Sequence, residues 1–478
     1  MNNYEQLYQK LVSSLTRKNR STMKVEKAYL MAREAHKNQR RIGGEPYIVH
    51  PLEVALILED LNFDADVLAA ALLHDVVEDC GITIEKLAEE FGSNVAEIVN
   101  TVSAIEKETF EKNDESLYVD QAFEKQALEE QTFKKLIKLG KKNPAGFYVK
   151  FADRIHNLRT IGVMPYYKQL EKVRETERWI LPIAEILKSN YFYREIKNEC
   201  FKIEHSKSIN DFLYTYANYY ECTKGHANKI KEQLISVFYK DNQSISVVID
   251  VIKEYEIYEY LKQQNLVHDI KHISNSHLNI LPFYNIYVVW EGNMQTSARY
   301  NQFFNNYYNK FKNSFTLIGG SLDEFSGHGK IIVKDESRNM YNIYLLNSVE
   351  MFRHNLGTED GIGTVDEFDT HEIVTKFIKV KSRSNEIIFM PENSTVLDFA
   401  FKIHQDIGFA FKYAIINDSP QKFPPYTKIN DGDTINIITS KDENMTLKNN
   451  AELKWLAYVQ TESAKRTLIK YFEKKLRK

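Results

Sequence analysis

The sequence predicts a multidomain protein with an all-helical N-terminal part, an α+β middle part and a small β-rich module. Segments with helical periodicity or helix-forming composition fill roughly the first two hundred residues. Strand-like runs begin only after residue 209, where they alternate with helical runs. Near the C-terminal end, residues 385–441 read as strand, helix, strand, turn and strand. A length of 478 residues fits about three such domains.

The N-terminal part contains several segments that predict helices. They are residues 25–39, 51–61, 66–79 and 83–105, and residues 174–207 are expected to add further helix. The apolar run Leu68–Leu73 contains strong helix formers and neither Gly nor Pro, so it predicts a buried helix. Pro51 directly follows His50, and helices often begin at such a proline because its fixed φ suits the first turn.

An unusual group of polar side chains follows that buried run. His74, Asp75, Glu78 and Asp79 lie within six residues, and on a continuous helix residues three and four apart are neighbours. Such an accumulation in a buried helix needs compensation, which a divalent cation with a bound water would supply. A His-Asp pair standing alone would more often be a hydrogen-bonded helix cap.

Two further segments supply matching side chains. His50 precedes Pro51, and Asp153 follows the helix-compatible residues 149–152. Two imidazoles and two carboxylates from three helical segments form a suitable set of ligands for a borderline-hard divalent ion such as manganese. The sequence therefore predicts a metal site built by His50, His74, Asp75 and Asp153.

The middle part and the module carry the strand signals. The expected strands of the middle part are residues 244–252, 280–291, 329–336 and 339–347, with helical runs such as 296–315 between them. In the module, Ser394 or Thr395 can cap a helix that carries Leu397 and Phe401. Residues 430–433 predict a turn before the strand at 434–439. Residues 442–478 are expected to form a helical tail, in which a helix contains Trp455 and the basic end, residues 467–478, forms a solvated amphipathic helix.

Composition excludes several classes of protein. The net charge of −3 and the pI near 6.5 argue against a general nucleic-acid binder. Cys80, Cys200 and Cys222 are widely spaced, so they predict neither a disulfide framework nor a zinc site. We expect a cytoplasmic protein without a membrane partner, because neither a signal peptide nor a bilayer-spanning apolar run is present.

Residues 40–58, 64–83 and 149–161 resemble the hydrolase domain of the RelA/SpoT-homologue family, which makes and degrades guanosine tetra- and pentaphosphate. His50, His74-Asp75 and Asp153 look like the ligand set of HD-domain phosphohydrolases. Residues 384–441 resemble a TGS domain, a β-grasp module. The resemblance implies an HD domain at 1–205, a nucleotidyltransferase-like synthetase domain at 206–383, and the TGS domain. The middle domain lacks the family's synthetase motifs Arg-x-Lys-Asp-Tyr, Gly-Tyr-Gln-Ser-Leu-His and Glu-x-Gln. We therefore expect a degenerate synthetase domain.

The resemblance also implies roles for individual residues. Mn²⁺ would be held by the predicted ligands, and Glu78 and Asp79 would activate water and move protons. Arg41 would pack on the guanine face. Asn157 matches the family's Asn that contacts the nucleotide, and Lys150 is also expected to bind the substrate.

The implied reaction is hydrolysis of the 3′-diphosphate of guanosine tetra- or pentaphosphate to GDP or GTP and pyrophosphate. Ile42 and Gly43 replace the family's usual Lys-Ser, which leaves open another nucleotide, such as NADPH, as the substrate. A regulatory protein that senses a nucleotide or tRNA is a second alternative. The TGS resemblance implies contact with tRNA or the ribosome. However, Phe409, Ala410 and Phe411 replace polar or basic residues there, so an intramolecular lid or a homodimer contact is the alternative.

Overall fold

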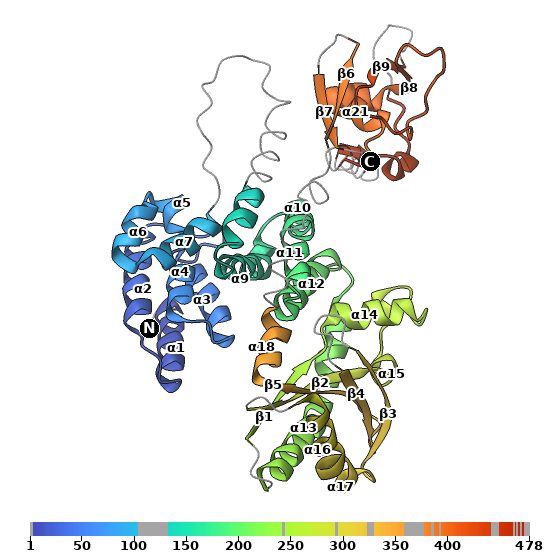
Figure 1. Cartoon of the computed structure of the whole chain (residues 1–478). Coiled ribbons are helices and arrows are strands. Elements are labelled where there is room, and N and C mark those ends of the chain that lie inside the picture. The colour runs from blue at the N-terminus through green and yellow to red at the C-terminus, as the bar shows by residue number, and fades with distance from the viewer. Residues whose placement is uncertain are drawn as a thin grey trace. The chain divides into compact units, whose positions relative to one another are not determined.

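The computed structural model describes residues 3–103, 132–240, 244–291, 295–322, 329–357, 377–383, 387–391, 393–440, 449–461 and single positions between 464 and 472. The chain divides into two compact units, residues 1–106 with 132–367, and residues 107–131 with 368–478 (Figure 1). The first unit contains the helical part and the middle part, and the second contains the β-rich module.

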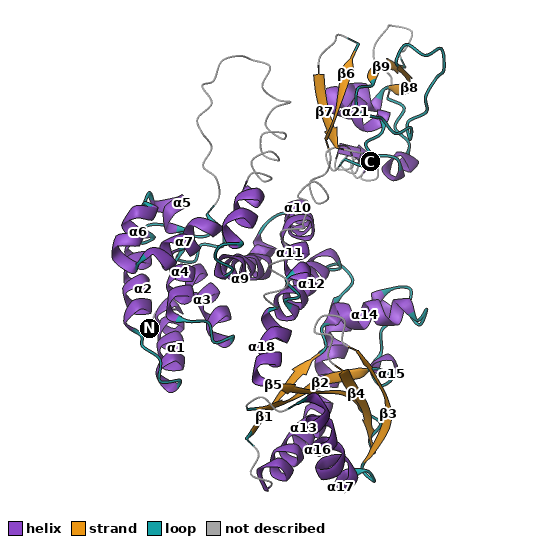
Figure 2. Ribbon diagram, in the orientation of Figure 1, coloured by secondary structure: helices purple, strands orange, loops and turns teal. Residues whose placement is uncertain are grey.

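The N-terminal part is helical, as predicted (Figure 2). Its elements are α1 (Asn3–Arg17), α2 (Met23–Ala35), α3 (Val49–Asp60), α4 (Ala65–Leu73), α5 (Val76–Cys80), α6 (Ile84–Phe91), α7 (Ser93–Val102), α9 (Ala145–Thr160), η1 (Ile161–Val163), α10 (Tyr166–Glu175), η2 (Thr176–Ile180), α11 (Leu181–Ile186) and α12 (Asn190–Glu204). Residues 132–140 are also helical.

Helices α3, α4 and α9 form the centre of this part. The Asp64 carboxylate caps α4 by accepting hydrogen bonds from the backbone N–H groups of Asp66 and Val67. Every residue from Val67 to Leu73 is then buried, as expected for a helix that is apolar on all sides. Helix α3 packs against both α4 and α9, so the three segments that carry the predicted ligands are neighbours in space.

The middle part is an α+β domain with a mixed five-stranded sheet. Its helices are α13 (Asn210–Lys240), α14 (Glu254–Gln263), η3 (Ile270–His272), α15 (Asn275–Leu278), α16 (Thr296–Gln302), η4 (Phe303–Tyr308), α17 (Asn309–Phe311) and α18 (Ser348–Leu356). Its strands are β1 (Ile245–Val251), β2 (Pro282–Trp290), β3 (Phe315–Leu322), β4 (Gly329–Asp335) and β5 (Met340–Asn347), in the order β1-β2-β5-β4-β3. Only the β2–β5 pair is parallel.

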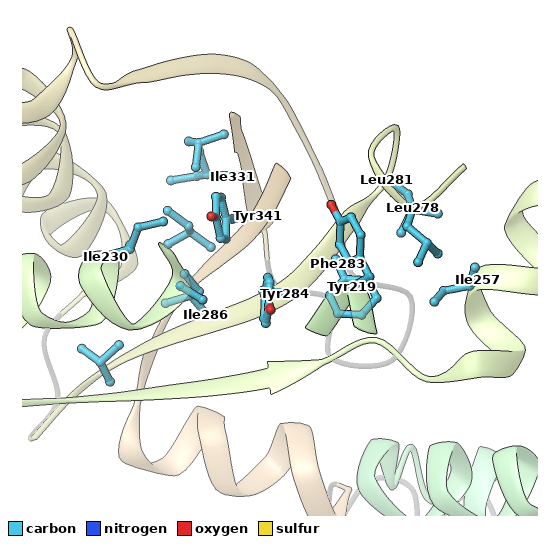
Figure 3. Packing of buried hydrophobic residues seen from close by; sticks show 14 of the residues in the cluster. Tyr219, Ile230, Ile257, Leu278, Leu281, Phe283, Tyr284, Ile286, Ile331 and Tyr341 are labelled. Atoms are coloured by element: carbon cyan, nitrogen blue, oxygen red, sulfur yellow. The ribbon is translucent and has the colours of Figure 1, made fainter. Parts of the chain in front are cut away.

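Both faces of this sheet are covered. On one face, Ile286 and Tyr341 pack with helical residues such as Tyr219 and Ile230 in the main core of the domain (Figure 3). On the other face, Tyr287 and Tyr344 form a smaller cluster against α18. Strands β1, β2, β4 and β5 were predicted. Strand β3 was not, because its sequence includes Gly319 and Gly320, which have low strand propensity.

The second unit is built around a four-stranded sheet. Its elements are β6 (Phe377–Ser382), β7 (Ile387–Pro391), α21 (Val396–Ile403), α22 (Gln405–Phe409), β8 (Phe411–Ile416), β9 (Thr434–Thr439) and η5 (Leu453–Ala457). The strand order is β7-β6-β9-β8, with β6 parallel to β9. Strand β6 lies before residue 384, so this sheet includes residues that the sequence analysis gave to the middle domain. Thr395 caps α21, as one of the two predicted choices.

The segment that follows the module packs into the core of the unit, and most of the solvated helix expected at 467–478 lies outside the described residues. Trp455, Val459, Ala464 and Leu468 are buried in the core of the unit. The carboxylate of Asp398, itself buried on α21, accepts hydrogen bonds from the backbone N–H groups of Gln460 and Thr461. The described part of this segment therefore closes the module. None of the helices formed by described residues combines the length and apolar composition that a membrane crossing requires.

Candidate metal centre of the helical domain

The four predicted ligands converge at one point. The Nε2 atoms of His50 and His74 lie 3.2 Å apart, and Asp153 Oδ1 lies 3.3 Å from His50 Nε2 and 3.8 Å from His74 Nε2. Asp75 places one carboxylate oxygen 3.1 Å from His74 Nε2 and the other 3.5 Å from His50 Nε2. Among the described residues, His50, His74 and Asp153 are identified as a group able to hold a metal ion.

His74 and Asp75 lie at the junction of two helices. Helix α4 ends at Leu73 and α5 begins at Val76, so the prediction that the run 66–79 is one helix is wrong at this point. Both residues keep right-handed helical dihedrals, and both side chains reach the same centre.

The electrostatics of the centre favour a cation. Burial lowers the pKa of His74, but the carboxylates of Asp75 and Asp153 outweigh burial and raise it to about 9. Burial lowers the pKa of His50. For Asp153, burial raises the pKa, but Lys150 and the two imidazoles hold it well below its usual range. A site that stabilises a positive charge on a buried imidazole also stabilises a divalent ion, and the buried N and O donors fit such an ion.

Two further side chains, Tyr47 and His156, support the predicted ligands. The Tyr47 hydroxyl donates a hydrogen bond of 2.8 Å to Asp75 Oδ2. His156 Nδ1 lies 2.7 Å from His50 Nδ1, so a hydrogen bond there directs His50 Nε2 into the centre. Burial, together with His50 and Arg41, lowers the pKa of His156 to about 3, which keeps this ring neutral. Tyr47 lies in the turn before α3, three residues before His50, and His156 lies on α9, three residues after Asp153.

Glu78 and Asp79 lie on α5 directly after the ligand pair, and both are exposed. The Asp79 backbone N–H donates to the Asp75 carbonyl, and the Asp79 carboxylate contributes to the raised pKa of Tyr47. The Glu78 carboxylate acts electrostatically on Lys135. The acidic pair is therefore beside the centre and open to solvent.

The predicted nucleotide-binding residues lie on the other side of Asp153. Lys150 Nζ is 3.3 Å from Asp153 Oδ2, and Asn157 Nδ2 donates a hydrogen bond of 2.5 Å to Asp153 Oδ1. Arg41 Nη2 in turn donates to Asn157 Oδ1 at 3.0 Å. Arg41, Asn157 and Asp153 thus form a continuous chain of contacts that ends at the metal centre.

Helix α9 is fixed at the residue after Asp153. The buried guanidinium of Arg154 donates to Glu175 Oε1 at 2.7 Å and to Thr176 Oγ1 at 3.1 Å. Lys172 adds a second cation to the Glu175 carboxylate, at 2.8 Å. Because α9 carries Asp153, this ion cluster holds a metal ligand in place through the helix.

Comparisons with known proteins cover most of the chain. Residues 28–185 match the HD domain and residues 373–439 match the TGS domain. The guanosine-3′,5′-bis(diphosphate) 3′-pyrophosphohydrolase of Haemophilus influenzae is 25% identical over 475 residues, which cover 93% of this chain and 67% of that protein. A probable GTP pyrophosphokinase of Mycobacterium leprae is 35% identical over 212 residues, 44% of this chain and 25% of that protein.

A second guanosine-3′,5′-bis(diphosphate) 3′-pyrophosphohydrolase, from Vibrio cholerae, is 38% identical over 163 residues, which cover 34% of this chain and 21% of that protein. The chain thus spans about two thirds or less of the length of these curated relatives. The chain therefore has an HD domain and a TGS domain, and its similarity to the Haemophilus influenzae protein along most of its length is consistent with the RelA/SpoT-homologue family.

Proposed function

We propose that the chain hydrolyses the 3′-diphosphate of guanosine tetra- or pentaphosphate, with Mn²⁺ as the metal. The observation that carries this proposal is the convergence of His50, His74, Asp75 and Asp153 within an HD domain. Two relatives with similar sequences bear the name of a 3′-pyrophosphohydrolase. A bound divalent ion would lower the pKa of a coordinated water and polarise a phosphoryl oxygen.

The reaction joins a water oxygen to the phosphorus attached to the 3′ oxygen and breaks the bond between that phosphorus and the 3′ oxygen. Pyrophosphate leaves, and the 3′ oxygen takes up a proton, which yields GDP or GTP. Glu78 and Asp79 are the exposed carboxylates beside the centre, so we assign them the removal of the water proton and its return to the 3′ oxygen.

Lys150, Asn157 and Arg41 extend from the centre toward the nucleotide. The Lys150 ammonium is a point charge near Asp153 and is suited to a phosphate. Asn157 uses one N–H on Asp153, and the second N–H of its amide can contact the nucleotide. The planar face of the Arg41 guanidinium can stack on the base.

The middle domain is proposed to lack synthetase activity. Its parallel strands β2 and β5 place Asn285 opposite Asn342, and the two buried amides bond to each other at 2.9 Å. Asp335 bonds to Asn339 and Tyr341, and Glu350 pairs with Arg299. Among the described residues of this domain, no three His, Cys, Asp or Glu side chains lie close enough together to share a metal ion.

The test of the proposed hydrolase is the release of pyrophosphate from guanosine tetraphosphate by the purified chain, with and without Mn²⁺. Asp153→Ala should abolish both hydrolysis and binding of Mn²⁺, because it removes the carboxylate that lies beside both imidazoles and would bind the metal with them. NADPH in the same assay tests the alternative substrate. Full activity of metal-free Asp153→Ala protein would overturn the proposal.

A further inference from the structure

The turn before the metal centre holds one guanidinium in a fixed orientation against α9. The Arg41 N–H donates to the Glu45 carbonyl and the Gly44 N–H donates to the Arg41 carbonyl, which closes the turn. In the side chain of Arg41, Nη2 donates to Asn157 Oδ1 at 3.0 Å and to Thr160 Oγ1 at 3.2 Å. Only 19% of this side chain is exposed, so these contacts determine where its other N–H groups point.

The second terminal nitrogen of the guanidinium points to a histidine that contacts a predicted ligand. Arg41 Nη1 lies 3.4 Å from His156 Nδ1, and the same nitrogen of His156 lies 2.7 Å from His50 Nδ1. Both rings are buried, and their centroids are 4.8 Å apart. One ring nitrogen of His156 therefore receives contacts from Arg41 and from His50.

The chemistry of the guanidinium determines where the hydrogens of these rings lie. An arginine side chain has five N–H donors and no acceptor, so its hydrogen bond makes His156 Nδ1 an acceptor. Since His156 Nδ1 then carries no hydrogen, His50 Nδ1 is the donor in the contact of 2.7 Å. A metal-binding imidazole is neutral and carries a single hydrogen, so His50 Nε2 keeps its lone pair.

The other imidazole of the centre obtains the same arrangement from the backbone. His74 Nδ1 lies 2.8 Å from the carbonyl oxygen of Ala71, which can only accept, so Nδ1 carries a hydrogen and Nε2 faces the centre. His50 has instead another imidazole as its partner, and an imidazole nitrogen can donate or accept. In the reverse arrangement the hydrogen would lie on His50 Nε2, where it would block a metal ion.

We infer that Arg41 is a positioning residue for the metal centre and acts through His156 on His50. The guanidinium keeps His156 Nδ1 an acceptor, and this acceptor keeps the hydrogen of His50 on the nitrogen remote from the metal. The affinity for Mn²⁺ thus depends on a cationic side chain that is not a ligand. This inference rests on the proposed metal centre. Loss of a group that orients a ligating imidazole typically lowers metal affinity by about 10–100-fold.

The experiment measures the Kd of Mn²⁺ for the purified full chain without nucleotide, so that lost substrate contacts cannot contribute. The EPR signal of free Mn²⁺ gives the bound fraction. Arg41→Met should raise this Kd by about 10–100-fold. Charge alone predicts the opposite, because removal of a positive charge beside a cation site strengthens binding of the cation. Arg40→Met is the matched control and should not raise the Kd, since the guanidinium of Arg40 donates to the Gly44 carbonyl in the same turn.

Two variants of His156 test the route from Arg41 to His50. His156→Asn keeps an oxygen acceptor near the position of Nδ1, so its Kd should stay close to that of the wild type. His156→Leu offers no acceptor and should raise the Kd by about 10–100-fold. Arg41→Met combined with His156→Leu should raise the Kd no further than His156→Leu alone, because both changes break the same chain of hydrogen bonds.

A Kd of Arg41→Met equal to or below that of the wild type would overturn the inference. The hydrolase function would still stand if the wild type releases pyrophosphate from guanosine tetraphosphate with Mn²⁺. Equal losses of affinity in His156→Asn and His156→Leu, or additive losses in the double variant, would also overturn the inference. A wild type that neither binds Mn²⁺ nor releases pyrophosphate would overturn the proposed function and this inference together.

Discussion

At the scale of the residue, the sequence predicted the four side chains that the structure brings together at the candidate metal centre, but not the contact of Tyr47 with one of them. The four were predicted because two imidazoles and two carboxylates stand in helical segments with a recognisable pattern. Tyr47 contacts Asp75, which is 28 residues away in the sequence, and His156 contacts His50, which is 106 residues away. Contacts between segments depend on packing that local pattern does not encode.

The acidic pair on α5 allows a test of proton transfer. Glu78→Gln and Asp79→Asn should each keep the bound Mn²⁺ but lower kcat by about 10²–10⁴-fold, the usual loss when general acid–base help is removed. Bound metal and kcat are measured on the same preparations. Glu89→Gln, at an exposed glutamate of α6, is the control and should behave as the wild type. Unchanged kcat in both variants would show that the pair has only a structural role.

At the scale of the element, periodicity predicted the helices but not their ends. The run from Leu68 to Asp79 has no Gly or Pro, yet the helix breaks at His74 and Asp75. Both residues keep right-handed helical dihedrals at this junction, so local propensity gives no signal for where one helix ends and the next begins. Strand β3 was missed for the opposite reason, since its pairing with β4 stabilises a strand that its two glycines disfavour.

The ion cluster between α9 and α10 should make stability depend on pH. Burial raises the pKa of Glu175, but Arg154 and Lys172 outweigh it and lower the pKa from 4.5 to about 2. A depressed pKa stabilises the folded state above the unfolded value, and this stabilisation is lost as the pH falls from about 4.5 through about 2. Because one pKa unit corresponds to roughly 1.36 kcal/mol, the lowered pKa of Glu175 corresponds to about 3 kcal/mol of folding stability.

Urea unfolding of the wild type and Glu175→Gln measures this contribution. The variant should be less stable by about 3 kcal/mol at pH 7, because the buried Arg154 loses its charged partner. The difference should narrow as the pH is lowered below 4.5, down to the lowest pH at which the wild type remains folded. A difference that stayed constant with pH would contradict the assignment of the low pKa to Glu175.

At the scale of the whole molecule, the order of three parts was predictable because helical and strand periodicities change along the chain. What sequence could not predict is where the parts meet. Helix α12 of the helical part contacts the middle domain through buried polar groups, and Arg194 pairs there with Glu256 and Asp250. A run of alternating charges on a helix predicts a solvated face, so such an interface has no distinctive local signal.

Because the middle domain is proposed to lack synthetase activity, we expect that the chain does not make guanosine tetra- or pentaphosphate. Asp153→Ala protein, which should not hydrolyse the product, is incubated with ATP, Mg²⁺ and GDP or GTP. No tetra- or pentaphosphate should accumulate, because the sequence of the middle domain lacks the motifs that would supply carboxylates for Mg²⁺ and positive groups for the phosphates. Accumulation of either product would show a working synthetase that uses other residues.

The closing segment of the second unit has a practical consequence for anyone who wishes to isolate the module. A fragment cut at residue 439, where the TGS match ends, would lose Trp455 and Val459 from its interior. It would also strip the Asp398 carboxylate of the donors from Gln460 and Thr461, each worth about 1.5–3 kcal/mol to a charged acceptor. The natural boundary for expression of this module therefore lies beyond residue 468.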